Sequence, residues 1–382
     1  MVGPVARRPE SIPGVQHRFD PRRPWFNHNG LNMFTPNTPA PNPAALAVLC
    51  DALGERAAVT AEVGPWKSGA FDLLARSGAL AGFIPAADGG TGAPELAILD
   101  ALVAIAARCL TTALALTQWA SASRIITGSE DAVRATWLPR LAAGTVTTTV
   151  GIAQLSTSRR HLGAPALIAS TAHGGWRLTG LCPWVTGADS VDAIVTGAVG
   201  QDGQQLFFIV PTDSPGLVIA PPMHMLALSG SRTSSVAFTD VAPSAVIEPR
   251  TAGGVRTGGL ATTALALGST VAALAVLEGE AVHRATLAPV AEALRAETRG
   301  IEARLRRAAT DGDTNDRDRL RADANGLVIR AAQAALTATK GAGFVEGHPA
   351  ARLVREAHFF LVWSCPQTVA GIALCELSRI EM

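Results

Sequence analysis

The residues from Thr145 to about Arg250 constrain the fold most, because their pattern differs from that of the chain on either side. They form short segments rich in β-branched residues, such as TVTTTVGIA, DAIVTGAV and SSVAFTDV, separated by turns such as HGG and TDSPG. This pattern predicts a small antiparallel β-unit, either a barrel or a sandwich. The flanking segments place apolar residues at helical spacing instead. The chain is therefore predicted to be α+β, with helices before and after one β-unit.

The helical segments predict two further units. Before the β-unit, the run from Glu95 to Ile126 is long and mostly apolar, which predicts a buried pair of helices. After it, long helical patterns, broken near TDGDTND and at GAGFVEGHP, predict a four-helix bundle. The first residues are rich in Pro, Asn and Arg and predict an irregular arm. The expected units are an arm at 1–43, an N-terminal helical domain at 44–144, a β-domain at 145–252 and a C-terminal helical bundle at 253–382.

An uncharged run at 257–277 raises the question of a membrane span. Its sequence, TGGLATTALALGSTVAALAVL, is just long enough to cross a bilayer. It contains five hydroxyl residues and few large apolar side chains, and it continues directly into the polar LEGEAVHR. We therefore predict a core helix of the bundle rather than a membrane segment.

Charge and cysteine usage exclude several classes of protein. The formal net charge of +1 leaves no basic excess for nucleic acid. The five cysteines are scattered without a CxxC pair, which argues against a disulfide framework and against a zinc site. The N-terminus carries arginines but lacks the apolar core of a secretory signal. We therefore expect a cytoplasmic protein with free thiols, no bound metal, no nucleic-acid partner and no membrane partner.

Two motifs in the β-unit resemble those of the acyl-CoA dehydrogenase superfamily. GWRLTGLCPWVTGADSVDAIVTGA is similar to the family's G-x-K-x-W-I-T-N strand pair, and LALSGSRTSSVAFTDV is similar to its G-x-R-x-S strand. In that family the Trp packs on the flavin and the Thr bonds near the N5 edge, and these positions are Trp184 and Thr186. Arg232 stands at the arginine of the second motif. The resemblance implies an acyl-CoA dehydrogenase-like fold with FAD as cofactor.

The resemblance continues in the C-terminal bundle. The helix that ends in AVHRATLAP aligns with the family's R-x-x-F-G-x-P, so Arg284 stands where the family reaches FAD across a subunit interface. KGAGFVEGHPAARLVREA resembles the family's G-G-x-G-Y-x-x-E-Y-P-V-E-R-L-x-R-D, with Gly341 in register. Thr337 stands at the Gln of the adenosine-end motif. The resemblance implies an FAD-dependent oxidoreductase that forms a homodimer or homotetramer and acts on a small molecule, with a CoA thioester as one possibility.

The catalytic carboxylate of the family is missing. In the family register its Glu falls on Ser364, in the sequence Trp-Ser-Cys-Pro, and the alternative position used by some relatives falls on Gly258. Removal of an α-proton beside a thioester needs a base of suitable pKa in contact with that proton. A serine hydroxyl is far too weak a base unless another group activates it. His358 lies six residues earlier on the same predicted helix, off the face of Ser364, and is predicted to be structural.

The loop that covers the flavin in the family is also altered. Where the family has T-E-P-x-A-G-S-D, this chain has QLSTSRRH, which includes Gln154, Ser156, Arg159 and Arg160. Arginine pairs well with pyrophosphate, so this loop could hold FAD through side chains. It could equally hold an anionic substrate or form an exposed basic turn.

These departures leave three functions open. The first is an FAD-dependent oxidoreductase acting on an acyl thioester or a related small molecule with an unrecognised base. The second is a flavin-dependent monooxygenase of the same fold, which needs no α-carbon base and fits the loss of the Glu better. The third is a non-catalytic partner subunit of a heteromeric acyl-CoA dehydrogenase. Retained FAD in the purified chain would favour an enzyme over the partner subunit.

Overall fold

The computed structural model describes most of the chain outside the N-terminal segment and a few loops. The described residues are 43–59, 69–156, 166–172, 174–247, 259–311 and 316–380. The predicted arm, the loop arginines Arg159 and Arg160, and Gly258 lie outside the described residues, as does the side chain of Ser156.

The N-terminal part is helical, and two of its apolar helices, Glu95–Arg108 and Leu110–Thr127, are joined by one residue. Cys109 has extended backbone angles and both ends α4 and begins α5, so the predicted buried helix pair is confirmed. Gly144 ends this part with a φ of +69°, which favours glycine. The elements are α1 Pro43–Val59, α2 Ala70–Arg76, α3 Ala79–Gly82, η3 Ala86–Asp88, α4 Glu95–Arg108, α5 Leu110–Thr127 and α6 Asp131–Ala142.

The central part is an eight-stranded sheet in the order β6-β7-β3-β2-β4-β5-β8, with β1 added beside β4. Most neighbours are antiparallel, as predicted, but β1 and β2 each pair with β4 in parallel. The sheet is therefore mixed. Its elements are β1 Thr148–Gly151, α7 Ala153–Ser156, β2 Leu167–Ala172, β3 Gly175–Val185, η5 Ala188–Ser190, β4 Ala193–Val199, β5 Gln205–Pro211, β6 Leu217–Ile219, η6 Ser229–Ser231, β7 Ser234–Val241 and β8 Ala245–Ile247.

The C-terminal part is a helical bundle built around α8 and α10. Helix α8 packs on α4, α9 and α10, and α10 packs on α9, α11 and α12. The elements are α8 Leu260–His283, η7 Ala285–Leu287, α9 Ala288–Asp311, α10 Arg317–Thr339, η8 Lys340–Phe344, α11 Pro349–Phe359 and α12 Gln367–Ser378.

Helix α8 is the apolar run that has the length of a membrane span. In the most apolar 18-residue stretch of this helix, 72% is buried inside the protein, as in a core helix. Gly268 allows α8 to cross α4 closely, because a Cβ there would lie 2.4 Å from the Val103 carbonyl oxygen and 2.6 Å from the Ala106 Cβ. The structure therefore places this segment as predicted, in the protein core.

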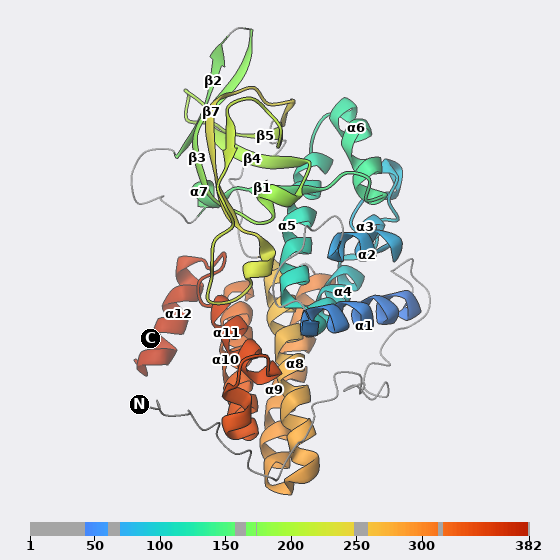
Figure 1. Cartoon of the computed structure of the whole chain (residues 1–382), viewed down its shortest axis with the longest axis vertical. Helices are drawn as coiled ribbons and strands as arrows, with labels where there is room; N and C mark the ends of the chain where they lie inside the picture. The colour runs from blue at the N-terminus through green and yellow to red at the C-terminus, as the bar shows by residue number, and fades with distance from the viewer. Residues whose placement is uncertain are drawn as a thin grey trace, which may run out of the picture.

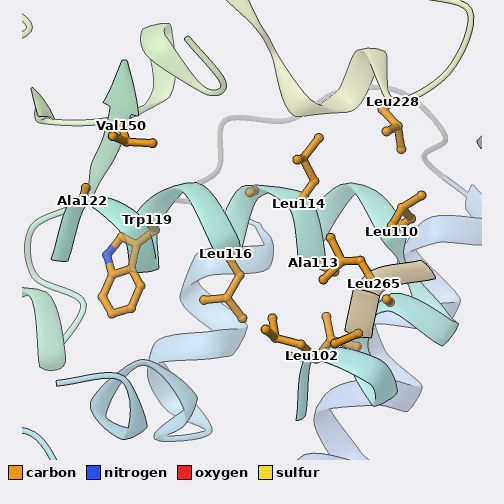
Figure 2. Close-up of a cluster of buried hydrophobic side chains, with 14 of the residues drawn as sticks. Leu102, Leu110, Ala113, Leu114, Leu116, Trp119, Ala122, Val150, Leu228 and Leu265 are labelled. Atoms are coloured by element: carbon orange, nitrogen blue, oxygen red, sulfur yellow. The ribbon is translucent and has the colours of Figure 1, made fainter. Parts of the chain in front are cut away.

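Helix α5 connects the three parts. Figure 1 shows the sheet at one end of the molecule, the bundle at the other and the N-terminal helices beside the junction. Helix α5 contacts α4, α8, β1 and η6. Figure 2 shows its buried side chains, from Leu110 to Ala122, facing Leu102 of α4, Leu265 of α8, Val150 of β1 and Leu228. This shared core fixes the sheet relative to the bundle.

Candidate functional site

The end of β3 presents an exposed tryptophan. The β3–β7 register pairs Cys182 with Val236 and Val185 with Ser234, so β3 has one extra residue in between. Pro183 and Trp184 lie in this irregularity, where proline removes no ladder hydrogen bond. Trp184 is 48% exposed although it is one of the largest apolar side chains. The bulge therefore turns an indole ring away from the core.

A chain of hydroxyl groups lies beside this tryptophan. The Thr186 Oγ1 lies 3.2 Å from the Thr233 Oγ1, which lies 2.8 Å from the Ser231 Oγ. Thr149 donates to the Thr186 carbonyl oxygen at 2.7 Å and fixes that backbone from β1. Ser231 and Thr233 are buried, whereas Thr186 is half-buried. This series of hydroxyl groups thus runs from the interior outward and ends at Thr186, the residue predicted to meet the flavin edge.

The turn after Thr186 is tied to the loop before β7. Gly187, with a φ of +68°, donates its N–H to the Ser231 carbonyl oxygen at 2.9 Å. Arg232 forms a two-point contact with Asp189, with its Nε 2.8 Å from Oδ1 and its second donor on Oδ2. Arg232, in register with the family arginine, therefore holds these two turns together.

Gln154 has a structural role that differs from the predicted cofactor contact. Its buried amide donates to the carbonyl oxygens of Gly151, at 3.1 Å, and Gly197, at 2.7 Å. Its oxygen accepts from the Cys182 Sγ at 2.9 Å. Burial raises the pKa of the Cys182 thiol to about 12, so the thiol remains protonated and donates. The side chain links β1, β3 and β4 because all three strands meet around it.

The residues predicted for the adenosine end meet at one end of the bundle. Arg284 pairs with Glu280 at 2.6 Å and also donates to the carbonyl oxygen of Ala338. The adjacent Thr337 is exposed, and its hydroxyl donates to the Gln333 carbonyl oxygen of its own helix at 2.9 Å. Gly341 follows in η8, with open space where a Cβ would lie.

The structure keeps this group away from Trp184 within one subunit. Helix α8 has 24 residues and is therefore about 36 Å long. It runs from the junction with the sheet to the opposite end of the bundle, where Arg284 follows its last residue (Figure 1). Trp184 and Thr186 therefore form one group, and Arg284, Thr337 and Gly341 form a second, separate group.

Ser364 lies in the turn between α11 and α12. It has a φ of +46°, in the left-handed region that non-glycine residues rarely adopt. Trp363 stacks on Phe359 with ring centroids 5.3 Å apart and an interplanar angle of 15°. Burial raises the pKa of the adjacent Cys365 thiol, although the Arg321 charge opposes that shift. His358 hydrogen-bonds through Nδ1 to the Val354 carbonyl oxygen at 2.7 Å, within its own helix.

Sequence reasoning missed the partners that support these turns. Thr233 and Arg321 contact the predicted site residues Thr186 and Ser364 through hydrogen bonds between segments far apart in the chain. Ser231 in turn contacts Thr233. The available signal was the polar pair Arg321 and Asn325, which lies four residues apart among the apolar positions of α10. Such a pair lies on one face of a helix, and at a buried face it requires partners.

Comparison with known proteins identifies the fold. No family model matches this chain. A curated relative described as a probable acyl-CoA dehydrogenase, YngJ of Bacillus subtilis (strain 168), is 25% identical over 187 residues, covering 47% of this chain and 49% of the relative. The match thus spans about half the length of that relative.

Solved structures match over nearly the whole chain. A glutaryl-coenzyme A dehydrogenase in its glutaryl-CoA complex gives a TM-score of 0.74 at 16% identity, covering 89% of this chain and 95% of that one. KijD3, in complex with FMN and dTDP-3-amino-2,3,6-trideoxy-4-keto-3-methyl-D-glucose, gives 0.71 at 22% identity, covering 91% and 96%. The chain has the acyl-CoA dehydrogenase fold, and the superfamily resemblance of its sequence is confirmed.

Proposed function

We propose that the protein is a flavin-dependent oxidoreductase of the acyl-CoA dehydrogenase type with an altered active site. The observation that carries this proposal is Trp184, an exposed indole on a bulge with the Thr186 hydroxyl beside it. An aromatic plane with a hydrogen-bonding edge suits a flat heterocycle, because the plane covers one face while the hydroxyl meets the polar rim. FAD is the cofactor proposed here, and it would supply the two-electron redox chemistry.

The protein's contribution is to bind and orient the ring. Trp184 would exclude water from one face of the flavin. The hydrogen bond between the Thr186 and Thr233 hydroxyl groups restricts the Thr186 hydroxyl to a few orientations, so the flavin edge would meet a pre-oriented group. Arg159 and Arg160 are proposed as pyrophosphate contacts on the strength of the sequence register.

The distant group at Arg284 is proposed to serve the cofactor of a second copy. Within one chain, Arg284 follows the end of α8 that lies away from the sheet, whereas Trp184 lies near the end of β3 in the sheet. A homodimer or homotetramer formed through the bundle would bring the Arg284 of one copy to the flavin of another. The exposed apolar residues Phe344 and Val345, next to Gly341, support burial of this region against a partner.

The substrate proposal follows from the residues around the missing carboxylate. The turn from Phe360 to Pro366 contains no acidic residue, so it offers no base for an α-proton. Dehydrogenation of an acyl thioester or related small molecule would need a base elsewhere. Flavin-dependent monooxygenation is the second candidate, and it is favoured by this lack of a base. The match to KijD3, which binds FMN and a dTDP-sugar, supports a small molecule other than a CoA thioester as an alternative substrate class.

The purified chain tests the proposal directly. The expected result is a yellow protein whose flavin absorbance co-elutes with the folded chain, or a colourless protein that takes up added FAD stoichiometrically. Binding of a panel of acyl-CoA thioesters and dTDP-sugars, followed by shifts of the flavin spectrum, then separates the two substrate classes, and oxygen consumption by the reduced flavin tests monooxygenation. A folded oligomer that neither retains nor binds flavin would refute the enzyme and support the non-catalytic partner subunit.

A further inference from the structure

In the part of the chain that the structure describes, the carbonyl groups of Phe360, Trp363 and Ser364 accept no main-chain hydrogen bond outside the helices. The first residues of the turn from Phe360 to Pro366 form short-range bonds, such as that from the Trp363 N–H to the Phe359 carbonyl oxygen at 2.9 Å. The chain then reverses at Ser364, and α12 begins at Gln367. Phe360 is fully buried, so one end of the turn is anchored in the core.

Two side chains of α10 satisfy these carbonyl groups. Asn325 donates from Nδ2 to the Phe360 carbonyl oxygen at 2.9 Å. Arg321 donates from one nitrogen to the Trp363 carbonyl oxygen and from another to the Ser364 carbonyl oxygen, each at 2.7 Å. Arg321 and Asn325 are four residues apart, so they project from the same face of α10. Together they hold both the beginning and the apex of the turn.

The burial of Arg321 is unusual for a residue that only supports a fold. The residue is 2% exposed, and its Nε has no hydrogen-bond partner among the described residues. Within the described ranges no carboxylate forms an ion pair with it, and burial lowers the pKa of its guanidinium. The Asp318 charge acts on this guanidinium only from beyond ion-pair distance. A buried charge without a paired carboxylate is destabilising, and groups of this kind concentrate at functional sites.

We propose that Arg321 and Asn325 are positioning residues that fix the turn carrying Ser364 in one conformation. The planar guanidinium is suited to this task, because its two donors restrain consecutive carbonyl groups at once. The left-handed conformation of Ser364 is then maintained by its surroundings, as expected for such a residue in a packed turn. The claim that this turn faces the flavin rests on the proposed function, whereas the restraint of the turn does not.

Alkylation of Cys365 tests the restraint without any cofactor. The folded protein would be treated with iodoacetamide, and the modification of each cysteine would be followed by peptide mass spectrometry. Asn325→Ala and Arg321→Gln should raise the Cys365 rate about three-fold to ten-fold or more, because the turn opens more often. Removal of the Arg321 charge also disfavours the thiolate, so a higher rate in Arg321→Gln must come from exposure.

The same experiment contains its controls. Arg330→Gln removes an arginine from the exposed face of α10, where it pairs with Glu297, and should leave the Cys365 rate unchanged. The buried Cys182 reports global unfolding, because it becomes reactive only when the sheet opens. If Arg321→Gln also raises the alkylation rate of Cys182, that variant unfolds globally, and the Cys365 rate in Asn325→Ala then tests the proposal. An unchanged Cys365 rate in folded Asn325→Ala and Arg321→Gln would overturn the proposal.

The flavin spectrum tests whether the restrained turn belongs to the site. Ser364→Glu in the FAD-loaded protein should shift the flavin absorbance bands, and adding Asn325→Ala should reduce that shift at least two-fold. A full shift in the double variant would overturn the positioning role while leaving the proposed function intact. If Ser364→Glu causes no shift, the placement of the turn at the flavin fails, and the positioning role toward a flavin fails with it. In the alkylation experiment, Arg321→Lys should reverse less than half of the rise in the Cys365 rate that Arg321→Gln causes. An ammonium group is a single point charge, whereas the planar guanidinium restrains two carbonyl groups at once.

Discussion

Replacement of Trp184 with alanine should lower the affinity for flavin by about 20-fold to 100-fold. A tryptophan side chain buries about 150–250 Å² when fully covered. Because 48% of this residue is exposed, about 100 Å² is available, and a ring lying on one face would cover roughly half of that. At about 25 cal/mol per Å² this contributes roughly 1.2 kcal/mol. Aromatic stacking adds about 0.5–1.5 kcal/mol, which gives a total of about 1.7–2.7 kcal/mol.

The assay is a titration of the flavin-free protein with FAD, followed by quenching of flavin fluorescence. Trp184→Phe keeps an aromatic plane and should recover most of the affinity. Val218→Ala, which truncates another exposed apolar residue of the sheet, is the matched control and should bind FAD as the parent does. Equal affinity and an unchanged flavin spectrum in Trp184→Ala would refute the placement of the ring on this indole.

Three further predictions follow from the charges of the loop and the bundle. Arg159→Ala together with Arg160→Ala should weaken binding of FAD or of an anionic substrate about ten-fold or more, as measured by titration. The reason is that a charge-assisted contact contributes about 1.5–3 kcal/mol. Unchanged binding of both ligands would show that neither arginine contacts a phosphate. Light scattering at micromolar concentration should find a dimer or tetramer, and Arg284→Ala should weaken FAD binding only in that assembly; a monomer would contradict the assignment of Arg284 to a second copy. His348 is the N-cap of α11 and accepts the Ala350 N–H at 3.1 Å. Burial lowers the pKa of its imidazole from 6.5. The stability that this cap contributes is therefore present above about pH 6.5 and is lost as the pH falls through the folded-state pKa. Urea unfolding should therefore show a decline of less than about 1 kcal/mol that His348→Asn flattens; the same decline in that variant would exclude His348 as its cause.

Local patterns predicted the order of the elements because helices and strands differ in period. The segments β2 and β8 were not predicted, since LIASTA and AVI are short and owe their strand conformation to neighbouring strands. The parallel pairing of β1 and β2 with β4 likewise depends on tertiary structure. A single sequence carries no signal for strand order beyond what the turns provide.

The candidate site divides in the same way. Trp184 and Thr186 were predicted together from a short motif, because they are two residues apart, at the end of β3 and directly after it. The role of Gln154 could not be predicted, because its partners Gly197 and Cys182 come from strands separated in sequence. The contact of Arg321 with Ser364 joins residues 43 positions apart, so only the folded bundle reveals it.

The most direct test of the altered active site is anaerobic mixing of the FAD-loaded protein with straight-chain acyl-CoA substrates. We predict that the parent flavin stays oxidised, because neither Ser364 nor Gly258 offers a carboxylate and loss of a general base typically reduces the rate by about 10²–10⁴. Ser364→Glu should introduce or raise bleaching of the flavin, and Ser364→Ala should behave as the parent does. Rapid bleaching in the parent that Ser364→Ala abolishes would show that the serine itself is catalytic and would contradict this account.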